Sequence, residues 1–349
     1  MPNIDLFSTR NMLELVERLP KPKTFLRDTF FKNHETSVTP SVEVDFVKGG
    51  RKLAPYVHEK IGGKIVENTG YTTETFKPPL VAPNKVTSAA DIMNRSAGEN
   101  PYSTQTPAER AIRKVATDFN ELEDMITRRE EFMCAQALFE GKIDVVGEGL
   151  SRVIDFSFEN KETLSGTDVW NNNASDPLAD LKEAKRTIQK TGSINPDIVI
   201  MSSDVADVFI QHPKVKDLLD VRNLQIGKID PQELPNGATY LGRLTNLGLD
   251  LYEYNEFYLD DFTDEESPTV KSMVPEGTVL VASSSAQNKM AYAAVTIMGD
   301  DDSFETIEAE RIPEAWAERR PARQFVQLNS KPLPIPAEVN SWYLLKVIG

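Results

Sequence analysis

The feature that most constrains the fold is a helical pattern of unusual length over residues 104–143. Thr106 and Glu109 have the spacing of a capping box, and Pro107 occupies the first helical position, so the start is well marked. Gly141 is a typical helix stop. Apolar residues recur between these ends at steps of three and four: Ile112, Val115, Phe119, Leu122, Ile126 and Met133. The pattern predicts one continuous helix with a single apolar seam.

A helix over residues 107–140 spans about 50 Å at ~1.5 Å per residue. A compact chain of this size has a radius of gyration of only about 20 Å. The helix is therefore long enough to cross a whole domain with its seam packed against other elements. A coiled coil is the alternative interpretation, although Arg129 interrupts the seam.

The composition is that of a globular protein of about two domains, with 349 residues, 40% hydrophobic and 27% charged. The 54 acidic residues outnumber the 39 basic ones, and the net charge of −15 repels nucleic-acid phosphates. General nucleic-acid binding is therefore disfavoured, and the charge suits either solubility or a container that must not adhere to nucleic acid. No apolar run approaches the ~18 residues of a membrane-spanning helix, so we expect no membrane partner.

Segments with little apolar surface of their own precede the long helix. Residues 8–19 have the pattern of a short amphipathic helix, and residues 41–47 alternate like a half-buried strand. Residues 49–83 place glycines between strand-like runs, which predicts a long hairpin arm. An isolated two-stranded hairpin is marginal in water, so this arm must lie on its own body or on a neighbour.

The chain after the long helix mixes helices and strands. Residues 176–192 begin with an Asp N-cap and a proline and end at a glycine, and a buried strand pattern follows. The last two strand patterns cover residues 322–335 and 341–348. We expect an α+β fold, with a mixed central domain and a β-rich set drawn from both sides of it.

Signatures of catalysis and cofactor binding are missing from the sequence. None of the Gly-Lys dipeptides has the context of a phosphate-binding loop, and no nucleophile-elbow or zinc-protease motif occurs. His34, His58 and His212 are far apart and lack metal-ligand spacing with Cys134. Cys134 lies beside the helix seam, which favours a buried inert thiol over a nucleophile. The sequence therefore predicts no catalytic residue, no cofactor and no metal site.

Two acidic loops leave an alternative open. Residues 260–267 and 299–305 are either solvated loops or ligands of a hard cation, although the second lacks the glycine of a calcium-binding hand. A hydrolase that used these loops would depend on Asp261 or Asp300.

A basic cluster stands out in this acidic chain at residues 311–324. Its members are Arg311, Arg319, Arg320 and Arg323. Arginine is favoured in salt bridges across subunit interfaces. The alternative is pairing within the chain, to Glu314 and Glu318.

The order of these features resembles the major capsid proteins of tailed phages, and particular stretches resemble the lambda-type major head protein (protein E) family. The resemblance is collinear from about residue 24 to residue 335. The stretches that carry it are residues 25–31, 41–47, 53–85, 201–222 and 319–335, above all RRPARQFVQLNSKPLPI at the end.

The resemblance implies the tailed-phage major capsid fold, with an N-arm that reaches a neighbouring subunit and an extended loop that lies over it. The implied segments are an N-terminal arm at 1–47, the extended hairpin loop at 48–90, a peripheral domain at 91–175 with a spine helix at about 106–140, an axial domain at 176–314, and C-terminal strands at 315–349 that return to the peripheral domain. Some relatives crosslink subunits through lysine and asparagine. Lys60 and Lys64 lie in the implied loop, but no partner asparagine is identifiable.

The implied function is a structural one, without enzymatic activity. Copies would form hexamers and pentamers of an icosahedral shell, which expands from a precursor and encloses double-stranded DNA without sequence-specific binding. Scaffolding and portal proteins, and in some relatives a decoration protein, are the implied partners. The protein would reside in the virion capsid after assembly in the host cytoplasm. An encapsulin-like nanocompartment shell is the alternative with the same fold.

Candidate interface residues follow from this interpretation. The expected subunit contacts are Phe25, Phe30 and Phe31 on the arm, Tyr56 and Ile65 on the loop, and Arg319, Arg320 and Arg323 at the C-terminal junction. Burial against neighbours, at ~25 cal/mol per Å² of apolar surface, would offset the ordering cost of such protruding segments.

Overall fold

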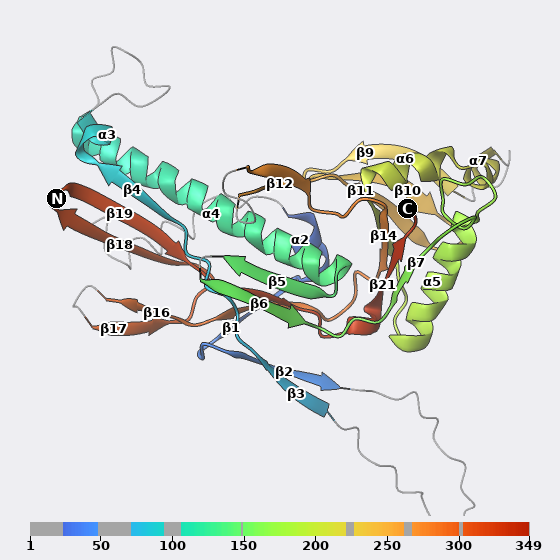
Figure 1. The fold of residues 1–349 in the computed structure, drawn as a ribbon, viewed down its shortest axis with the longest axis horizontal. Helices are drawn as coiled ribbons and strands as arrows, with labels where there is room; N and C mark the ends of the chain where they lie inside the picture. The colour runs from blue at the N-terminus through green and yellow to red at the C-terminus, as the bar shows by residue number, and fades with distance from the viewer. Residues whose placement is uncertain are drawn as a thin grey trace, which may run out of the picture.

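A computed structural model describes residues 24–47, 71–93, 106–147, 149–220, 227–261, 267–299 and 303–348. Within these residues, helices and strands build an α+β fold (Figure 1). The long helix α4 (Pro107–Phe139) runs across the molecule from the short helix α3 (Ala89–Met93) toward a large sheet at the opposite end. The predicted amphipathic helix at residues 8–19 lies outside the described ranges. None of the described helices is long and apolar enough to cross a membrane.

Helix α4 confirms the prediction of one long helix. The backbone N–H of Glu109 donates to Thr106 Oγ1 at 3.3 Å, and the backbone N–H of Thr106 donates to Glu109 Oε2 at 2.8 Å, which completes the capping box. Gly141 ends the helix with φ +75°, and a Cβ there would lie 2.4 Å from Cβ of Phe158. Ile112, which we placed on the seam, is exposed.

The seam of α4 packs on a sheet of the same chain. That sheet has the order β18 (Ile312–Arg319), β19 (Ala322–Asn329) and β4 (Asn84–Ser88), all antiparallel. Val326 and Leu328 of β19 meet the buried seam residues Val115, Phe119, Leu122 and Ile126. The seam therefore has an intrachain partner, in place of the second helix that a coiled coil would supply.

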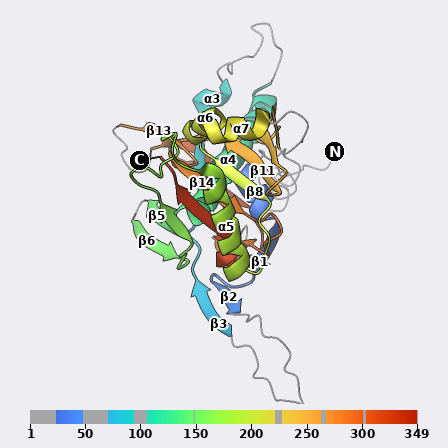
Figure 2. The ribbon, with the colours of Figure 1, turned by 90° about the vertical axis from the view of Figure 1, so that its right-hand side faces the viewer.

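A mixed seven-stranded sheet forms the other end of the molecule (Figure 1). Its order is β7 (Lys161–Thr163), β21 (Trp342–Lys346), β14 (Thr278–Ala282), β8 (Ile198–Met201), β11 (Leu249–Tyr254), β10 (Ala238–Leu244) and β9 (Gly227–Glu233). Three helices accompany it, α5 (Pro177–Thr191), α6 (Ser203–Gln211) and α7 (Pro213–Asp220), and Figure 2 shows α5 in front of the sheet. The apolar faces of these helices pack on one face of the sheet, and together they form a hydrophobic core.

The last strand corrects the prediction that residues 315–349 return together to the peripheral domain. Strands β18 and β19 do lie along α4, but β21 lies inside the seven-stranded sheet, parallel to β7 and antiparallel to β14. Trp342 and Leu345 are buried there, and the indole of Trp342 stacks on Phe158 at 5.0 Å. An apolar strand buried on both faces gains most in the interior of a sheet, and its pattern alone does not say which sheet.

The remaining strands form small ladders. They are the sheet of β1 (Asn33–Ser37), β15 (Lys289–Ala293) and β20 (Pro332–Ile335), and the pairs β2 (Val42–Val47) with β3 (Tyr71–Phe76), β5 (Lys142–Gly147) with β6 (Leu150–Asp155), β12 (Phe257–Asp260) with β13 (Thr269–Ser272), and β16 (Val295–Met298) with β17 (Phe304–Ile307). The implied boundary between arm and loop at residue 47 falls inside the β2–β3 hairpin, because the two strands pair along their full length.

Replacing Leu122 by Asp should abolish soluble expression or lower the free energy of unfolding by several kcal/mol, because it places a charge in the buried seam. Met125→Asp on the same helix is the matched control, since Met125 is 52% exposed, and its effect should stay within about 0.5 kcal/mol. Urea denaturation compares the two. Equal stability of both variants would contradict the packing of α4 on β19.

Candidate assembly surfaces

Helix α4 carries four buried carboxylates, which determine how the rest of the chain meets it. They are Asp118, Glu123, Glu130 and Glu131, each at most 2% exposed. A buried carboxylate without partners is costly, so each must be paired or hydrogen-bonded. Asp118 is served by Lys114 on its own helix at 2.7 Å and by Lys85 of β4 at 3.4 Å. The other three take their partners from segments distant in sequence.

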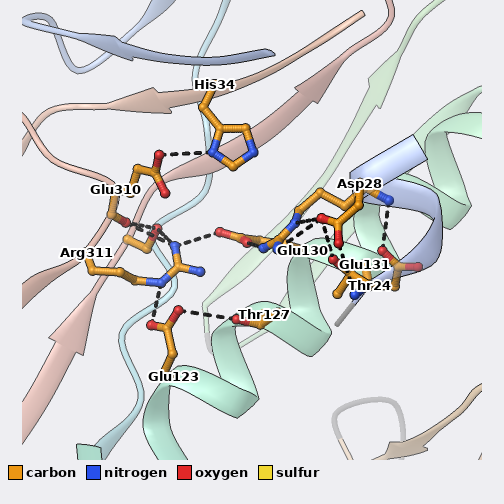
Figure 3. A network of polar contacts seen from close by, with 11 residues as sticks. Thr24, Asp28, His34, Glu123, Thr127, Glu130, Glu131, Glu310 and Arg311 are labelled. Carbon is orange, nitrogen blue, oxygen red and sulfur yellow. Dashed lines mark hydrogen bonds and ion pairs between the residues drawn. The ribbon is translucent and has the colours of Figure 1, made fainter. Parts of the chain in front are cut away.

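Arg311 joins two of these carboxylates (Figure 3). Its Nε donates to Glu123 and its Nη1 donates to Glu130, both at 2.7 Å. Glu130 also accepts from Nη1 of Arg27 at 2.8 Å. Burial, the largest single cause, would lower the pKa of both arginines, but the neighbouring acidic groups, Glu130 foremost, together outweigh it. Both pKa values are therefore raised, and both guanidinium groups stay charged.

Glu131 anchors the short helix α2 (Phe25–Phe30) to α4. Its carboxylate accepts the backbone N–H groups of Leu26 and Arg27, at 2.8 and 3.0 Å, and the hydroxyl of Tyr254 at 2.8 Å. The N-cap residue, Thr24, makes no side-chain cap, so Glu131 supplies this function from another helix. Burial raises the pKa of Glu131, and the three donors oppose that rise.

The structure places Phe25, Phe30 and Phe31 in the chain's own core, which corrects their expected position at a subunit interface. All three are buried, and the ring of Phe25 lies 5.3 Å from the rings of both Tyr252 and Tyr254. The reason is the anchoring of α2 by Glu131, which turns this part of the arm inward. A segment rich in large apolar residues has the same sequence pattern whether a neighbouring subunit or its own chain buries it.

The arginine cluster divides into two parts in the structure. Arg311 is the buried hub between Glu123 and Glu130, a role that sequence reasoning missed because its partners lie more than 180 residues away. Arg319, Arg320 and Arg323 are exposed at the turn between β18 and β19. They therefore form a basic tip on a largely acidic chain.

Next to this basic tip, the outer face of the β18–β19–β4 sheet carries a row of apolar side chains. Trp316 pairs with Phe325, and Phe325 pairs with Val86, so the three stand side by side across the strands. The rings of Trp316 and Phe325 stack at 5.0 Å and 3°. Trp316 is 39% exposed and Val86 is 44% exposed. A surface tryptophan stacked on a second aromatic ring is typical of interface hot spots.

Three of the side chains considered for chemistry, Asp260, Cys134 and His212, are buried. Asp260 is buried and pairs with Lys271 at 2.5 Å. Burial raises the pKa of Cys134 well above its usual value, which makes the thiol a poor nucleophile. Buried His212 lies 3.3 Å from Ser175 Oγ. The described residues contain no group of three acidic, histidine or cysteine side chains able to hold a metal ion.

Several expected positions lie outside the described residues. They are Tyr56, Ile65, Lys60 and Lys64 in the implied loop, and the central residues of both acidic loops, 262–266 and 300–302. Asp261 is described and exposed.

Comparison with known proteins gives a consistent result over nearly the whole chain. The family model described as phage major capsid protein E matches residues 8–347. The major capsid protein of Escherichia phage lambda is 24% identical, over 96% of this chain and 97% of its own length. The major capsid protein of Escherichia phage N15 is 23% identical, over 99% of this chain and 100% of its own length.

Solved structures share the fold. The capsid protein of an Escherichia coli CFT073 prophage superposes with a TM-score of 0.71 at 19% identity, covering 97% of this chain and 99% of its own. A phage-related protein from Bordetella bronchiseptica RB50 superposes with a TM-score of 0.57 at 13% identity, covering 98% of each chain.

Replacing Arg311 by Met should lower the free energy of unfolding by about 3–5 kcal/mol, because it leaves buried Glu123 without its cation and weakens the pairing of Glu130. Arg243→Met is the matched control, since the Arg243–Asp250 pair lies at the surface and contributes at most about 1 kcal/mol. Chemical denaturation of both variants measures the difference. If Arg311→Met lowered the free energy of unfolding no more than Arg243→Met, Arg311 would not be holding its carboxylate partners on α4 in place.

Proposed function

The chain belongs to the phage major capsid protein E family, and from this membership we propose how its exposed surfaces assemble a shell. The protein is a major capsid protein of a tailed phage, with the fold of that class, and it associates with copies of itself in the virion capsid. The arrangement of the subunits and the role of each protruding segment form the proposal.

The copies form hexamers and pentamers of an icosahedral shell that encloses double-stranded DNA. The net charge of −15 supports the enclosure of DNA, because an acidic lining lets packaged DNA slide without adhering. Binding of the DNA is accordingly independent of its sequence. Nuclease-protected DNA inside purified particles distinguishes this function from that of an encapsulin-like compartment, which would hold enzymes.

The observation that carries the proposal is the β2–β3 ladder, which extends from the body in both views (Figures 1 and 2). Val42 and Val44 are buried where β2 leaves the body, whereas Glu43, Thr73, Glu74 and Thr75 of the ladder are exposed. A two-stranded ladder with this polar surface has little to stabilise it alone. We propose that it rests on an adjacent subunit, together with residues 48–70, which contain Tyr56 and Ile65.

We propose two further contacts, one made by the N-terminal residues and one by the basic tip. Residues 1–23 precede the anchored helix α2 and are the part of the arm that we propose reaches a neighbour, since residues 24–31 pack on their own body. Arg319, Arg320 and Arg323 form a further contact at the basic tip. The proposed interface does not include Phe25, Phe30 and Phe31, because they are buried within their own subunit.

Other proteins complete the assembly that we propose. A separate scaffolding protein, a portal protein and, on some shells of this kind, a decoration protein are the expected partners. Assembly takes place in the host cytoplasm. We propose no catalytic activity and no cofactor, in keeping with a mechanical role.

Replacing residues 48–70 by an Asn-Gly turn should leave a folded subunit that forms no closed shell. Val47 and Tyr71 are paired in the ladder, so a two-residue hairpin turn joins them without strain. Circular dichroism checks the fold, and negative-stain microscopy with the scaffolding protein checks assembly. In the control, the same turn replaces residues 261–268 between the paired residues Asp260 and Thr269, and shells should form. Normal shells from the first variant would refute the role of the loop.

A further inference from the structure

A cavity of about 350 Å³ lies between the last turns of α4, strand β5 and the β12–β13 pair. Figure 1 shows β5 beside the C-terminal end of α4. The cavity, here called the α4 end cavity, has the size of a small ligand pocket, since such pockets measure roughly 300–1,000 Å³. Much of its lining is apolar, from Phe132, Ala135, Phe139, Val146, Tyr258 and Met273.

One polar group in this lining, the carboxamide of Gln136, has an oxygen without a donor. Gln136 lines the cavity and is only 9% exposed. Within the described part of the chain, its Oε1 has no hydrogen-bond partner. A buried acceptor without a donor is unfavourable. A ligand that donates a hydrogen bond to this oxygen would remove that cost.

The charged groups around the α4 end cavity favour a cation. Glu140, Asp144 and Asp260 line it, and Lys271 is the only basic residue among its described lining residues. Lys271 pairs with Asp260 at 2.5 Å, whereas Lys142 lies 2.9 Å from Asp144 but 3.9 Å from Glu140. Burial raises the pKa of Glu140, and the charge of Lys142 opposes that rise only in part. Of the three carboxylates, Glu140 therefore has the most distant cation.

Gln136 and Glu140 also lie at the negative end of a helix. They are four residues apart at the C-terminal end of α4, a spacing that places side chains on the same side of a helix. The carbonyl end of a helix carries a partial negative charge, and the last turn of α4 contains no basic residue. A positive charge bound there would meet an acceptor, a carboxylate and the helix end together.

We propose that the α4 end cavity binds a primary alkylammonium group. The ammonium donates to Oε1 of Gln136 and pairs with Glu140. Its alkyl stem lies against Phe139 and Met273, which removes apolar surface from water. An organic cation suits this site better than a metal ion, because the described residues contain no group of three acidic, histidine or cysteine side chains able to hold a metal. All these groups belong to one chain, so the inference goes beyond the proposed function and does not depend on it.

Titration of n-butylammonium chloride into the full-length subunit at neutral pH tests this site. The methyl NMR signal of Met273, assigned with the variant Met273→Leu, reports what enters the cavity. We expect a saturable shift of this signal. The neutral probe n-butanol has the same stem, and it should bind about tenfold more weakly because it lacks the charge that strengthens both polar contacts.

Variants of the two polar groups show which side chains hold the ammonium. Gln136→Leu removes the acceptor and should weaken binding of n-butylammonium about tenfold. Glu140→Gln removes the negative charge and should weaken it a few-fold, as expected for a partly exposed ion pair. Asp124→Asn is the matched control, because Asp124 is exposed on the same helix and does not line the cavity, and it should bind as the unmodified chain does.

Three results would overturn the proposal. They are the lack of a saturable shift with n-butylammonium, equal affinity for n-butanol, and unchanged affinity in both Gln136→Leu and Glu140→Gln. An alkylammonium group can come from a free polyamine or from a lysine side chain of another protein. Putrescine and Nα-acetyl-lysine methylamide, titrated in the same way, represent these two sources, and the tighter binder identifies the source.

Discussion

Burial of carboxylates along α4 is the constraint on which the rest of the structure depends. Each buried acid needs a partner. The partners come from four parts of the chain: Lys85 of β4, Arg27 and the first amides of α2, Tyr254 of β11, and Arg311 immediately before β18. Without these segments, α4 would leave most of its buried carboxylates without partners, so the helix would not be stable alone. The spine is therefore stable only when segments from both ends of the sequence are in place, which makes the body one cooperative unit.

The structure combines a tightly packed body with projecting segments that the rest of the chain covers poorly. This combination suits a shell subunit. The hub and the cores hold α4, the β18–β19–β4 sheet and the seven-stranded sheet as a firm frame. The β2–β3 ladder and the β16–β17 hairpin extend from that frame and expose polar backbone edges or apolar tips. A lone subunit stabilises these projections weakly, whereas neighbours in a shell can cover them, so assembly and ordering are expected to be coupled.

The sequence predicted local features well and long-range partners poorly. Helix α4 was predictable because its cap, seam and stop are encoded within its own residues, and β2 and β3 because their alternation is local. The sheet that receives β21 was not predictable, since a doubly buried strand fits any interior position. The inward packing of Phe25 depends on Glu131, and the hub role of Arg311 depends on Glu123 and Glu130; both pairings exist only after folding. The capsid function came from the order of segments over the whole chain, which no single motif carries.

The most direct test of the account is backbone amide hydrogen exchange of the β2–β3 ladder, measured in the free subunit and in the assembled shell. The account predicts that the amides of β2 and β3 near Phe46 and Thr72 exchange readily in the free subunit, while those of β8 and β14 are protected in both states. In the shell, exchange of the ladder should slow by about tenfold or more, which corresponds to ~1.4 kcal/mol of added local stability. Equal protection of the ladder in both states would contradict the claim that neighbouring subunits complete this part of the fold.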